Sequence, residues 1–437
     1  MAHRRLRDKF FDVNGKTFSG HTKLQKAVLH NDLARVESLI ASGVKIDATT
    51  ENSKIPPVLM ALSRKRLSIF NYILDHGGYC DLNNHDYYQD KGLTPLSYAI
   101  NKSEQFYPWE RSEVIEKLLE RGADPFKELD PKDKNKTPFT MAIEKNDRGV
   151  IGALSSSYNV DLKTMINGRS VAHIAALLNS GEALTKFIEK EPDLLRIRSK
   201  DKGALPLMFV AYNGDISTIR GLSPMKDMDV NARDYNGNTA MHYVLENETL
   251  TPKEKLETLQ ILALKGADIA IANNKGQTIL HQLAYQGAEG NLEIMHGLLK
   301  NKRDSELKKL VNIKDSEDKT PLFMAAVDGL LYARGRLKPT KVHNHLVDFL
   351  LDHGANPNCQ DWRGFTPLDR LAELADRESM VVQRLLKSGA EYNKMMDTEE
   401  VADLKANVRG KKQEKPSTPI PLVKKKKTPP SNKGPKF

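Results

Sequence analysis

The sequence predicts an all-α fold: a solenoid of stacked helix pairs with short β-hairpin turns, followed by a disordered basic C-terminal tail. Three observations support this prediction. A phrase of the Thr-Pro-Leu kind recurs along the 437 residues, a second phrase with a glycine near its end follows six of the ten copies, and the excess positive charge lies at the C-terminal end. Self-similarity at a period of roughly 20 to 50 residues is typical of stacked repeats.

The first phrase marks the start of ten units. Threonine can cap the free amides of a helix, and proline at the first helical position lacks only a donor that would stay unpaired anyway. Each copy therefore predicts the start of a helix, and the apolar residues after it lie on one face at helical spacing. The ten copies begin at Thr22, Pro56, Thr94, Thr137, Ser170, Leu205, Thr239, Thr278, Thr320 and Thr366.

The second phrase indicates where each unit ends. Gly122, Gly266, Gly354 and Gly389 each follow a Leu-rich stretch, and glycine turns left-handed at a helix end without a Cβ clash. Asn236-Gly237 is typical of a hairpin turn. Each unit is therefore expected to be a tight turn followed by two antiparallel helices.

These phrases resemble those of the ankyrin repeat family, whose unit of about 33 residues carries a TPLHxA phrase. The resemblance covers about residues 20–392 and is weakest in the repeats beginning at Pro56, Thr137 and Ser170. It implies an N-terminal arm or cap (1–19), an ankyrin array (20–394) and a Lys/Pro-rich tail (395–437). It also implies a monomeric protein that binds protein partners.

Motifs of catalysis and metal binding are not found in this sequence. There is no phosphate loop, GxSxG, HExxH or CxxC pattern. We therefore predict no enzyme activity, no cofactor and no metal. One alternative is an enzyme whose activity lies in the divergent repeats 137–200.

The sequence also contains histidine and cysteine residues of the types that serve in catalysis and metal binding. Because of the resemblance, the TPLH-position histidines are expected to link successive hairpins. The His343-x-His345 pair has no third ligand near it in the sequence, so it is predicted in a solvated loop rather than a metal site. Cys80 and Cys359 lie in turn regions without the signature of a cysteine protease. The histidines in the TPLH position are His173, His242 and His281.

The resemblance implies that the binding surface is the concave face, which is made of hairpin tips and first helices. Exposed aromatic and Arg side chains are the usual anchors of an interface. Inserted loops are expected at 105–110, 288–291 with 302–307, and 334–341. The candidate partner-binding residues are Tyr235, Trp362 and Arg363 at hairpin tips, Tyr212 at the end of a first helix, and Tyr107 and Trp109 in an inserted loop.

The formal net charge of +10 comes from the tail. Residues 405–437 hold eleven Lys or Arg and one acid, while the other 404 residues hold 56 charges of each sign. The tail also has six prolines and few apolar residues. Because such a segment cannot bury enough surface to offset its ordering entropy, we expect it to be disordered.

Two lysine clusters in the tail resemble a bipartite nuclear localisation signal, which implies a nuclear import receptor as partner. Three other interpretations stay open for the tail alone: binding to anionic membrane, binding to nucleic acid or chromatin, and a solubilising role. The signal residues are Lys411, Lys412, Lys424, Lys425, Lys426 and Lys427.

Two cysteines and no long apolar run predict a soluble intracellular protein without a signal peptide, with the nucleus as one destination. The irregular, Lys- and Asn-rich style of the repeats resembles effectors that intracellular bacteria deliver into host cells. In that case the protein would be secreted into the host.

Overall fold

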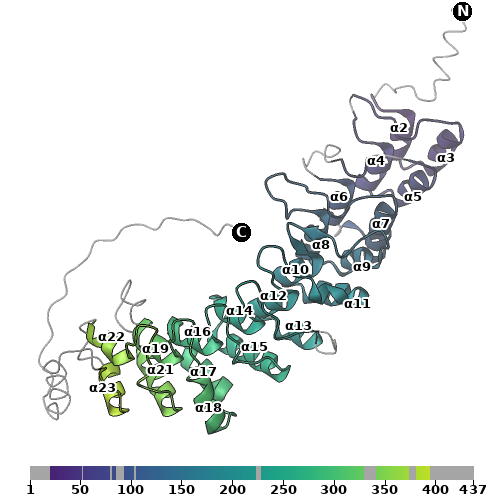
Figure 1. Ribbon diagram of the computed structural model, residues 1–437. Coiled ribbons are helices and arrows are strands. Elements are labelled where there is room, and N and C mark those ends of the chain that lie inside the picture. The colour runs from purple at the N-terminus through teal and green to yellow at the C-terminus, as the bar shows by residue number, and fades with distance from the viewer. Residues whose placement is uncertain are drawn as a thin grey trace, which may run out of the picture. The chain divides into compact units, whose positions relative to one another are not determined.

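The computed structural model of the chain is predominantly helical, as predicted (Figure 1). It describes residues 20–51, 53–78, 81–84, 93–102, 105–222, 228–328, 341–373 and 380–393. Within these ranges the helices form ten pairs, one for each unit expected from the repeated phrase. The N-terminal arm, Cys80, most of the insertion at 334–341 and the six tail lysines lie outside the described residues.

The first helix of each pair begins at the Thr-Pro-Leu phrase or a looser copy of it. The side-chain oxygens of Thr22, Thr94, Thr137 and Thr320 accept the backbone N–H three residues further on, which confirms the predicted caps. The first helices are α2 (Lys23–Leu29), α4 (Pro57–Ser63), α6 (Pro95–Asn101), α8 (Pro138–Lys145), α10 (Val171–Leu177), α12 (Pro206–Asn213), α14 (Ala240–Glu246), α16 (Ile279–Gln286), α19 (Pro321–Phe323) and α22 (Pro367–Glu373).

The second helices run back beside the first. The expected glycines follow four of them with φ between 85° and 93°, a conformation in which glycine avoids a Cβ clash. The second helices are α3 (Leu33–Ala41), α5 (Leu67–Asp75), α7 (Pro108–Glu120), α9 (Arg148–Ser156), α11 (Gly181–Lys190), α13 (Ile216–Gly221), α15 (Pro252–Leu264), α17 (Asn291–Leu299), α21 (Lys341–Asp352) and α23 (Met380–Lys387).

Five further elements are added to this pattern. The strands β1 (Met165–Ile166) and β2 (Arg169–Ser170) form an antiparallel hairpin, and a 3₁₀ turn, η2 (Pro192–Arg196), follows α11. A further helix, α18 (Asp304–Leu310), occupies the insertion expected at 302–307. Helix α19 continues as a π turn, η3 (Met324–Asp328).

The chain divides into two compact units, Met1–Asn356 and Pro357–Phe437. In the first unit the first helices form one row, in which α12 packs against α10 and α14, and α14 packs against α16. The second helices form a parallel row, in which α15 contacts α13 and α17. In the second unit α22 packs against α23.

Buried apolar side chains join neighbouring pairs. The ring of Phe139 lies 5.1 Å from that of Phe126 and 5.3 Å from that of Phe187, centroid to centroid. Fully burying one such side chain contributes about 1.5–3 kcal/mol. Each repeat therefore depends on its neighbours for its core.

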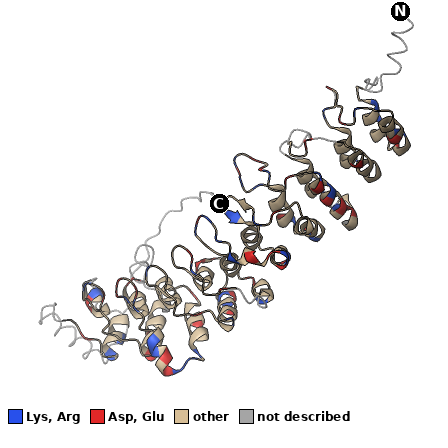
Figure 2. Cartoon of the chain, turned by 45° about the vertical axis from the view of Figure 1, so that its right-hand side comes forward, with Lys and Arg blue, Asp and Glu red and all other residues tan. Residues whose placement is uncertain are grey.

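The charged residues of both signs lie interspersed along the helices (Figure 2).

Candidate functional site

Hydrogen bonds between hairpin turns fix one face of the first unit. We call the turns at 165–169, 199–204, 234–238, 273–277 and 315–319, with the first helices α10 to α19, the hairpin face. Along it, each turn donates a backbone N–H to a carbonyl of the turn before. The four nitrogen-to-oxygen distances are 2.8 to 2.9 Å. They join Lys200 to Gly168, Tyr235 to Lys202, Asn274 to Asn236 and Ser316 to Lys275, with the donor named first in each pair.

Three buried histidines add side-chain links to this ladder. His242 accepts the Thr239 backbone N–H on Nδ1 at 3.1 Å, so its proton lies on Nε2, 3.1 Å from the carbonyl oxygen of Gln277 in the next turn. His173 and His281 reach the carbonyls of Ala204 and Lys319 in the same way. The structural role expected for these histidines is confirmed.

Burial sets the protonation state of these histidines. It lowers the pKa of His173 and of His281 from 6.5 to about 4, although the carbonyl of the next turn favours the protonated ring in each case. Burial also lowers the pKa of His242. All three rings are therefore neutral at pH 7.

The first repeat uses glutamine at the same position. Gln25 Oε1 accepts the Thr22 backbone N–H at 2.9 Å, and its Nε2 donates to the carbonyls of Ser53 and Ile55 at 3.2 and 2.9 Å. Gln25 is fully buried. An amide thus makes the same two links as the neutral imidazole.

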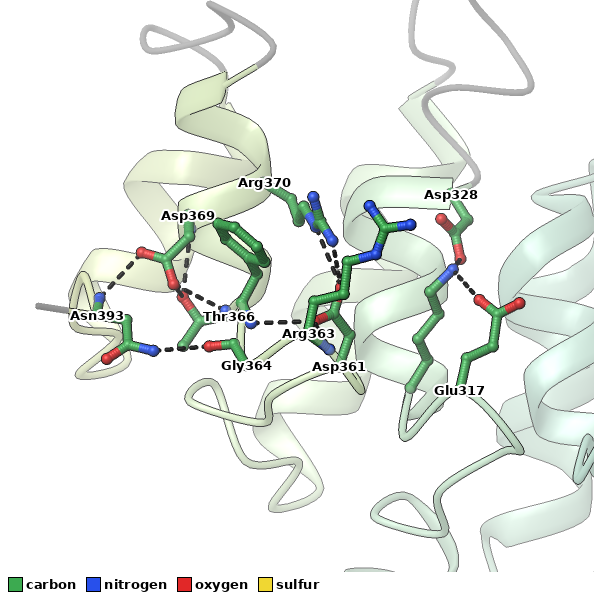
Figure 3. A network of polar contacts seen from close by, with 11 residues as sticks. Glu317, Asp328, Asp361, Arg363, Gly364, Thr366, Asp369, Arg370 and Asn393 are labelled. Atoms are coloured by element: carbon green, nitrogen blue, oxygen red, sulfur yellow. Dashed lines mark hydrogen bonds and ion pairs between the residues drawn. The ribbon is translucent and has the colours of Figure 1, made fainter. Parts of the chain in front are cut away.

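In the second unit the position is an aspartate. Asp369 accepts the Thr366 backbone N–H and hydroxyl, and its other oxygen accepts the Asn393 N–H at 2.9 Å (Figure 3). Asn393 donates in turn to the carbonyl of Gly364 at 2.6 Å. A carboxylate accepts here where the imidazole donates, because the group that it meets is a backbone N–H.

An ion pair closes the hairpin of the second unit. Asp361, whose side chain is 2% exposed, accepts Nε and Nη2 of Arg370 at 3.1 and 2.8 Å (Figure 3). Burial raises the pKa of Asp361, but hydrogen bonds from Arg370 and from the backbone of Phe365 outweigh it and hold the pKa below 3.8. The carboxylate therefore stays ionised.

The candidate binding residues of the first unit are exposed. Tyr235 is 60% exposed at its hairpin tip and lies against Gly203, and Tyr212 is 36% exposed at the end of α12, as predicted. Tyr107 lies just before α7 as its cap, outside the helix, but the placement of Trp109 in a loop is wrong: Pro108 sets the first helical φ, and Trp109 lies in the first turn of α7. The rings of Tyr107 and Trp109 stack in parallel, 6.4 Å apart.

Trp362 and Arg363 lie at the predicted hairpin tip of the second unit. Trp362 is 60% exposed, and the guanidinium carbon of Arg363 lies 4.6 Å from the centroid of its ring. The structure thus brings these two candidates together, and Tyr107 with Trp109, while each tyrosine of the hairpin face comes from its own repeat. A binding role for all six residues stays a prediction.

One exposed aromatic residue of the hairpin face was not among the sequence candidates. Tyr285 is 39% exposed near the end of α16. It stands seven residues after Thr278, and Tyr212 stands seven residues after Leu205. Aligning the repeats by the first residue of the phrase would have identified it.

Carboxylates gather at the turn before α19. Lys319 Nζ lies 2.8 Å from Asp328 and 2.9 Å from Glu317 (Figure 3). Burial raises the pKa of Asp328 and of Asp315; for Asp328 the charges of Glu317 and Asp315 add to the effect, and Lys319 offsets only part of it. Counting the described residues, this corner of the hairpin face therefore has more carboxylates than the ammonium group of Lys319 neutralises.

The His343-x-His345 pair is not in a loop, so that expectation is wrong. Both residues belong to α21, where His343 is 3% exposed. Burial lowers its pKa, while the Tyr285 carbonyl favours the protonated ring. Among the described residues there is no cluster of three His, Cys, Asp or Glu that could hold a metal ion, and Cys359 is buried.

Together, these links and two-helix units define a helical repeat protein with a fixed surface. A family model of three ankyrin repeats matches residues 24–128, and a model of one ankyrin repeat matches residues 317–362. The chain is an ankyrin-repeat protein. Such repeats are protein-interaction scaffolds and are typically non-catalytic.

Similar curated proteins carry ankyrin repeats in different settings. The chain is 26% identical to the poly [ADP-ribose] polymerase tankyrase of Caenorhabditis elegans over 73% of its own length, which is 13% of that protein. It is 23% identical to the human transient receptor potential cation channel subfamily A member 1 over 88% of its length and 32% of the channel. It is 24% identical to the phosphocholine transferase AnkX of Legionella pneumophila over 66% of its length and 31% of that enzyme.

The chain thus spans at most a third of the length of these relatives. None of the described helices is long and apolar enough to cross a membrane.

Proposed function

We propose that this chain is a non-catalytic scaffold that binds a protein partner on its hairpin face, which is concave in the ankyrin family. The observation that carries the proposal is the set of exposed tyrosines, Tyr212, Tyr235 and Tyr285, on turns and first helices that backbone and histidine hydrogen bonds hold in place. Aromatic rings supply much contact area at low entropic cost. A pre-ordered surface also loses little entropy on binding.

Affinity capture with the full chain tests this proposal. The test variant is Tyr212→Ala, Tyr235→Ala and Tyr285→Ala combined; the control is Tyr158→Ala, because Tyr158 is 83% exposed in the loop after α9 and outside the hairpin face. We expect the wild type and the control to capture the same partner, and the triple variant to capture at least tenfold less of it. Equal capture by all three proteins would contradict the proposal.

We further propose that the chain is a monomer whose Lys/Pro-rich tail sets its location, with Lys411–Lys412 and Lys424 to Lys427 as a nuclear localisation signal. The concentration of the net charge in residues 405–437 supports this. A reporter fused to that segment should enter nuclei, and changing the four consecutive lysines to Ala should release it. Accumulation at the plasma membrane instead, or binding to nucleic acid that falls steeply with salt, would favour the alternatives.

An origin as a bacterial effector delivered into host cells is the more specific form of this proposal. The similarity to AnkX from Legionella pneumophila supports it. Expression as a fusion to a translocation reporter in a bacterium with a host-directed secretion system tests it, with a tail-less chain as the control. A signal from the host cytosol is expected only with the tail present.

A further inference from the structure

Two hollows adjoin on the hairpin face of the last repeats of the first unit. One has a volume of about 570 Å³ and is lined by the turn at 315–319, Lys275 and Asp328. The other has a volume of about 630 Å³ and is lined by Glu248, Pro252 and Glu289. Tyr285 and Gln277 belong to both. We call the two hollows together the Tyr285 groove; each is within the size range of ligand sites in proteins.

Among the described residues that line them, carboxylates outnumber cations in both hollows. The first holds Asp315, Glu317 and Asp328 against Lys275 and Lys319. Lys319 already bonds to two of these carboxylates, and its side chain is only 17% exposed. An added cation would therefore meet carboxylates that the protein itself neutralises only in part.

The second hollow repeats this imbalance. In the part of its lining that the structure describes, the carboxylates are Glu248 and Glu289 and the one lysine is Lys255. Burial lowers the pKa of Lys255, although Glu248 raises it. Gln282 also lines this hollow, and its Oε1 is buried without a hydrogen-bond partner among the described residues. Both features favour a ligand that brings positive charge and hydrogen-bond donors.

The walls between these carboxylates are apolar and aromatic. Leu250 and Pro252 line the second hollow, Met324 lines the first, and Tyr285 lines both. Lys and Arg side chains lay their methylene stems along apolar surface and keep the charge at the tip, and the face of a tyrosine ring attracts a cation. The groove thus matches long basic side chains better than small inorganic cations.

The backbone of the groove is fixed before any ligand arrives. Ser316 donates its N–H to Lys275, and the Gln277 carbonyl accepts His242. The two hollows share Tyr285 and Gln277 and otherwise involve successive repeats, and neighbouring helices pack about 8–10 Å apart. A polyproline-like or extended chain covers that distance in about three residues, at about 3.1–3.3 Å per residue.

We propose that the Tyr285 groove binds an extended segment of the partner protein that carries two Lys or Arg residues three positions apart. This inference rests on the scaffold function proposed above and names the chemistry of the segment that the scaffold receives. Each basic side chain enters one hollow, and the Tyr285 ring lies between them.

Fluorescence anisotropy with the full chain tests the inference. The probe is a labelled peptide of Ser, Gly and Pro with two Lys three residues apart, and the matched peptide has Gln in both places. We expect the Lys peptide to bind, the Gln peptide to bind at least tenfold more weakly, and added salt to weaken the first complex. Failure of the Lys peptide to bind, or equal binding of both peptides, would overturn the inference.

Two groove variants locate the binding. Glu317→Gln with Asp328→Asn should lose at least tenfold in affinity for the Lys peptide. Because these changes also remove ion pairs to Lys319, Glu248→Gln with Glu289→Gln is made separately and should lose severalfold. The control, Glu257→Gln with Glu293→Gln, has the same change in charge on exposed positions of α15 and α17 and should bind as the wild type does.

Equal losses in the control and the groove variants would mean a general charge effect and would overturn the inference. If replacing Lys424, Lys425, Lys426 and Lys427 by Ala increases the affinity for the Lys peptide, the occupant of the groove is the chain's own tail instead of a partner. If the Lys peptide fails while capture still depends on Tyr212 and Tyr235, the groove inference is wrong and the scaffold function stands. If that capture fails as well, both are wrong.

Discussion

Gly276 faces the backbone of Ser316 in the next repeat so closely that a Cβ atom at position 276 would stand 2.5 Å from the Ser316 nitrogen. Gly276 also has a φ of 72°, which L side chains rarely adopt. The close approach lets Ser316 donate to the Lys275 carbonyl at 2.9 Å. The turn ladder therefore requires glycine here for two independent reasons.

Replacing Gly276 by Ala should destabilise the chain more than replacing Gly266. Gly266 has a φ of 93°, and a Cβ atom there would meet nothing within 4 Å. Gly266→Ala should therefore cost only the conformational strain of about 1–2 kcal/mol, and Gly276→Ala should add the loss of a turn-to-turn contact, about 1 kcal/mol or more. Urea unfolding followed by circular dichroism measures both; equal losses would mean that the close approach does not matter.

Removing the His242 link should cost more with alanine than with glutamine. His242→Ala leaves the Thr239 N–H and the Gln277 carbonyl without their partner, a loss of about 1–3 kcal/mol. His242→Gln can restore both bonds, since Gln25 makes the same pair in the first repeat. Thermal and urea unfolding of the two variants measure the difference, and a glutamine variant as unstable as the alanine variant would argue against this equivalence.

The three buried histidines should make the array lose stability in mild acid. Their folded pKa lies below the unfolded value of 6.5, at about 4 for His173 and His281. The unfolded chain then binds protons that the folded chain does not. The stabilisation that the neutral histidines contribute to the free energy of unfolding is therefore complete above pH 6.5 and falls as the pH drops from 6.5 toward 4. Each histidine contributes up to about 1.4 kcal/mol per pH unit.

A variant with His173, His242 and His281 all changed to Gln should show a flatter profile over this range. Urea midpoints at pH 7 and pH 5 for the wild type and this variant supply the comparison. Titrating carboxylates contribute to both profiles and cancel in the difference. Parallel profiles would exclude the histidines as the source of the acid sensitivity.

Neutralising Arg370 should loosen the second unit. Arg370→Gln leaves the Asp361 carboxylate buried with only its backbone donors, and removing one partner of a buried pair costs about 3–5 kcal/mol. Arg363→Gln is the matched control, because Arg363 is exposed and its guanidinium lies over Trp362. Hydrogen exchange at the amides of Gly364 and Phe365 should accelerate in the first variant and stay unchanged in the second.

The sequence predicts the order and the limits of the helices well, because local backbone chemistry sets them. Threonine caps such as Thr94 and glycines such as Gly122 act within a few residues of their own position. The placement of His343 and of Trp109 was wrong because long-range packing and one additional proline decided it. The turn links through His242 follow from the family resemblance and not from spacing alone.

The Tyr285 groove could not be predicted by inspecting one repeat at a time. Its carboxylates come from Glu248, Glu289 and the segment 315–328, which stacking alone brings together. Only the exposure of Tyr285 had a local signal, its place seven residues after the start of the phrase. The charge balance of 56 against 56 outside the tail conceals such a local imbalance.

The π turn of η3 has a consequence for how this repeat tolerates changes in length. A π turn holds one residue more than an α turn over the same span, so Met324–Asp328 absorbs an insertion without lengthening the helix. Deleting one residue there should give a regular α-helix that still stacks on α16, but Asp328 would rotate by about 100° around the axis and leave Lys319. An apparently neutral shortening of the gene would thus keep the architecture and erase a charge pattern.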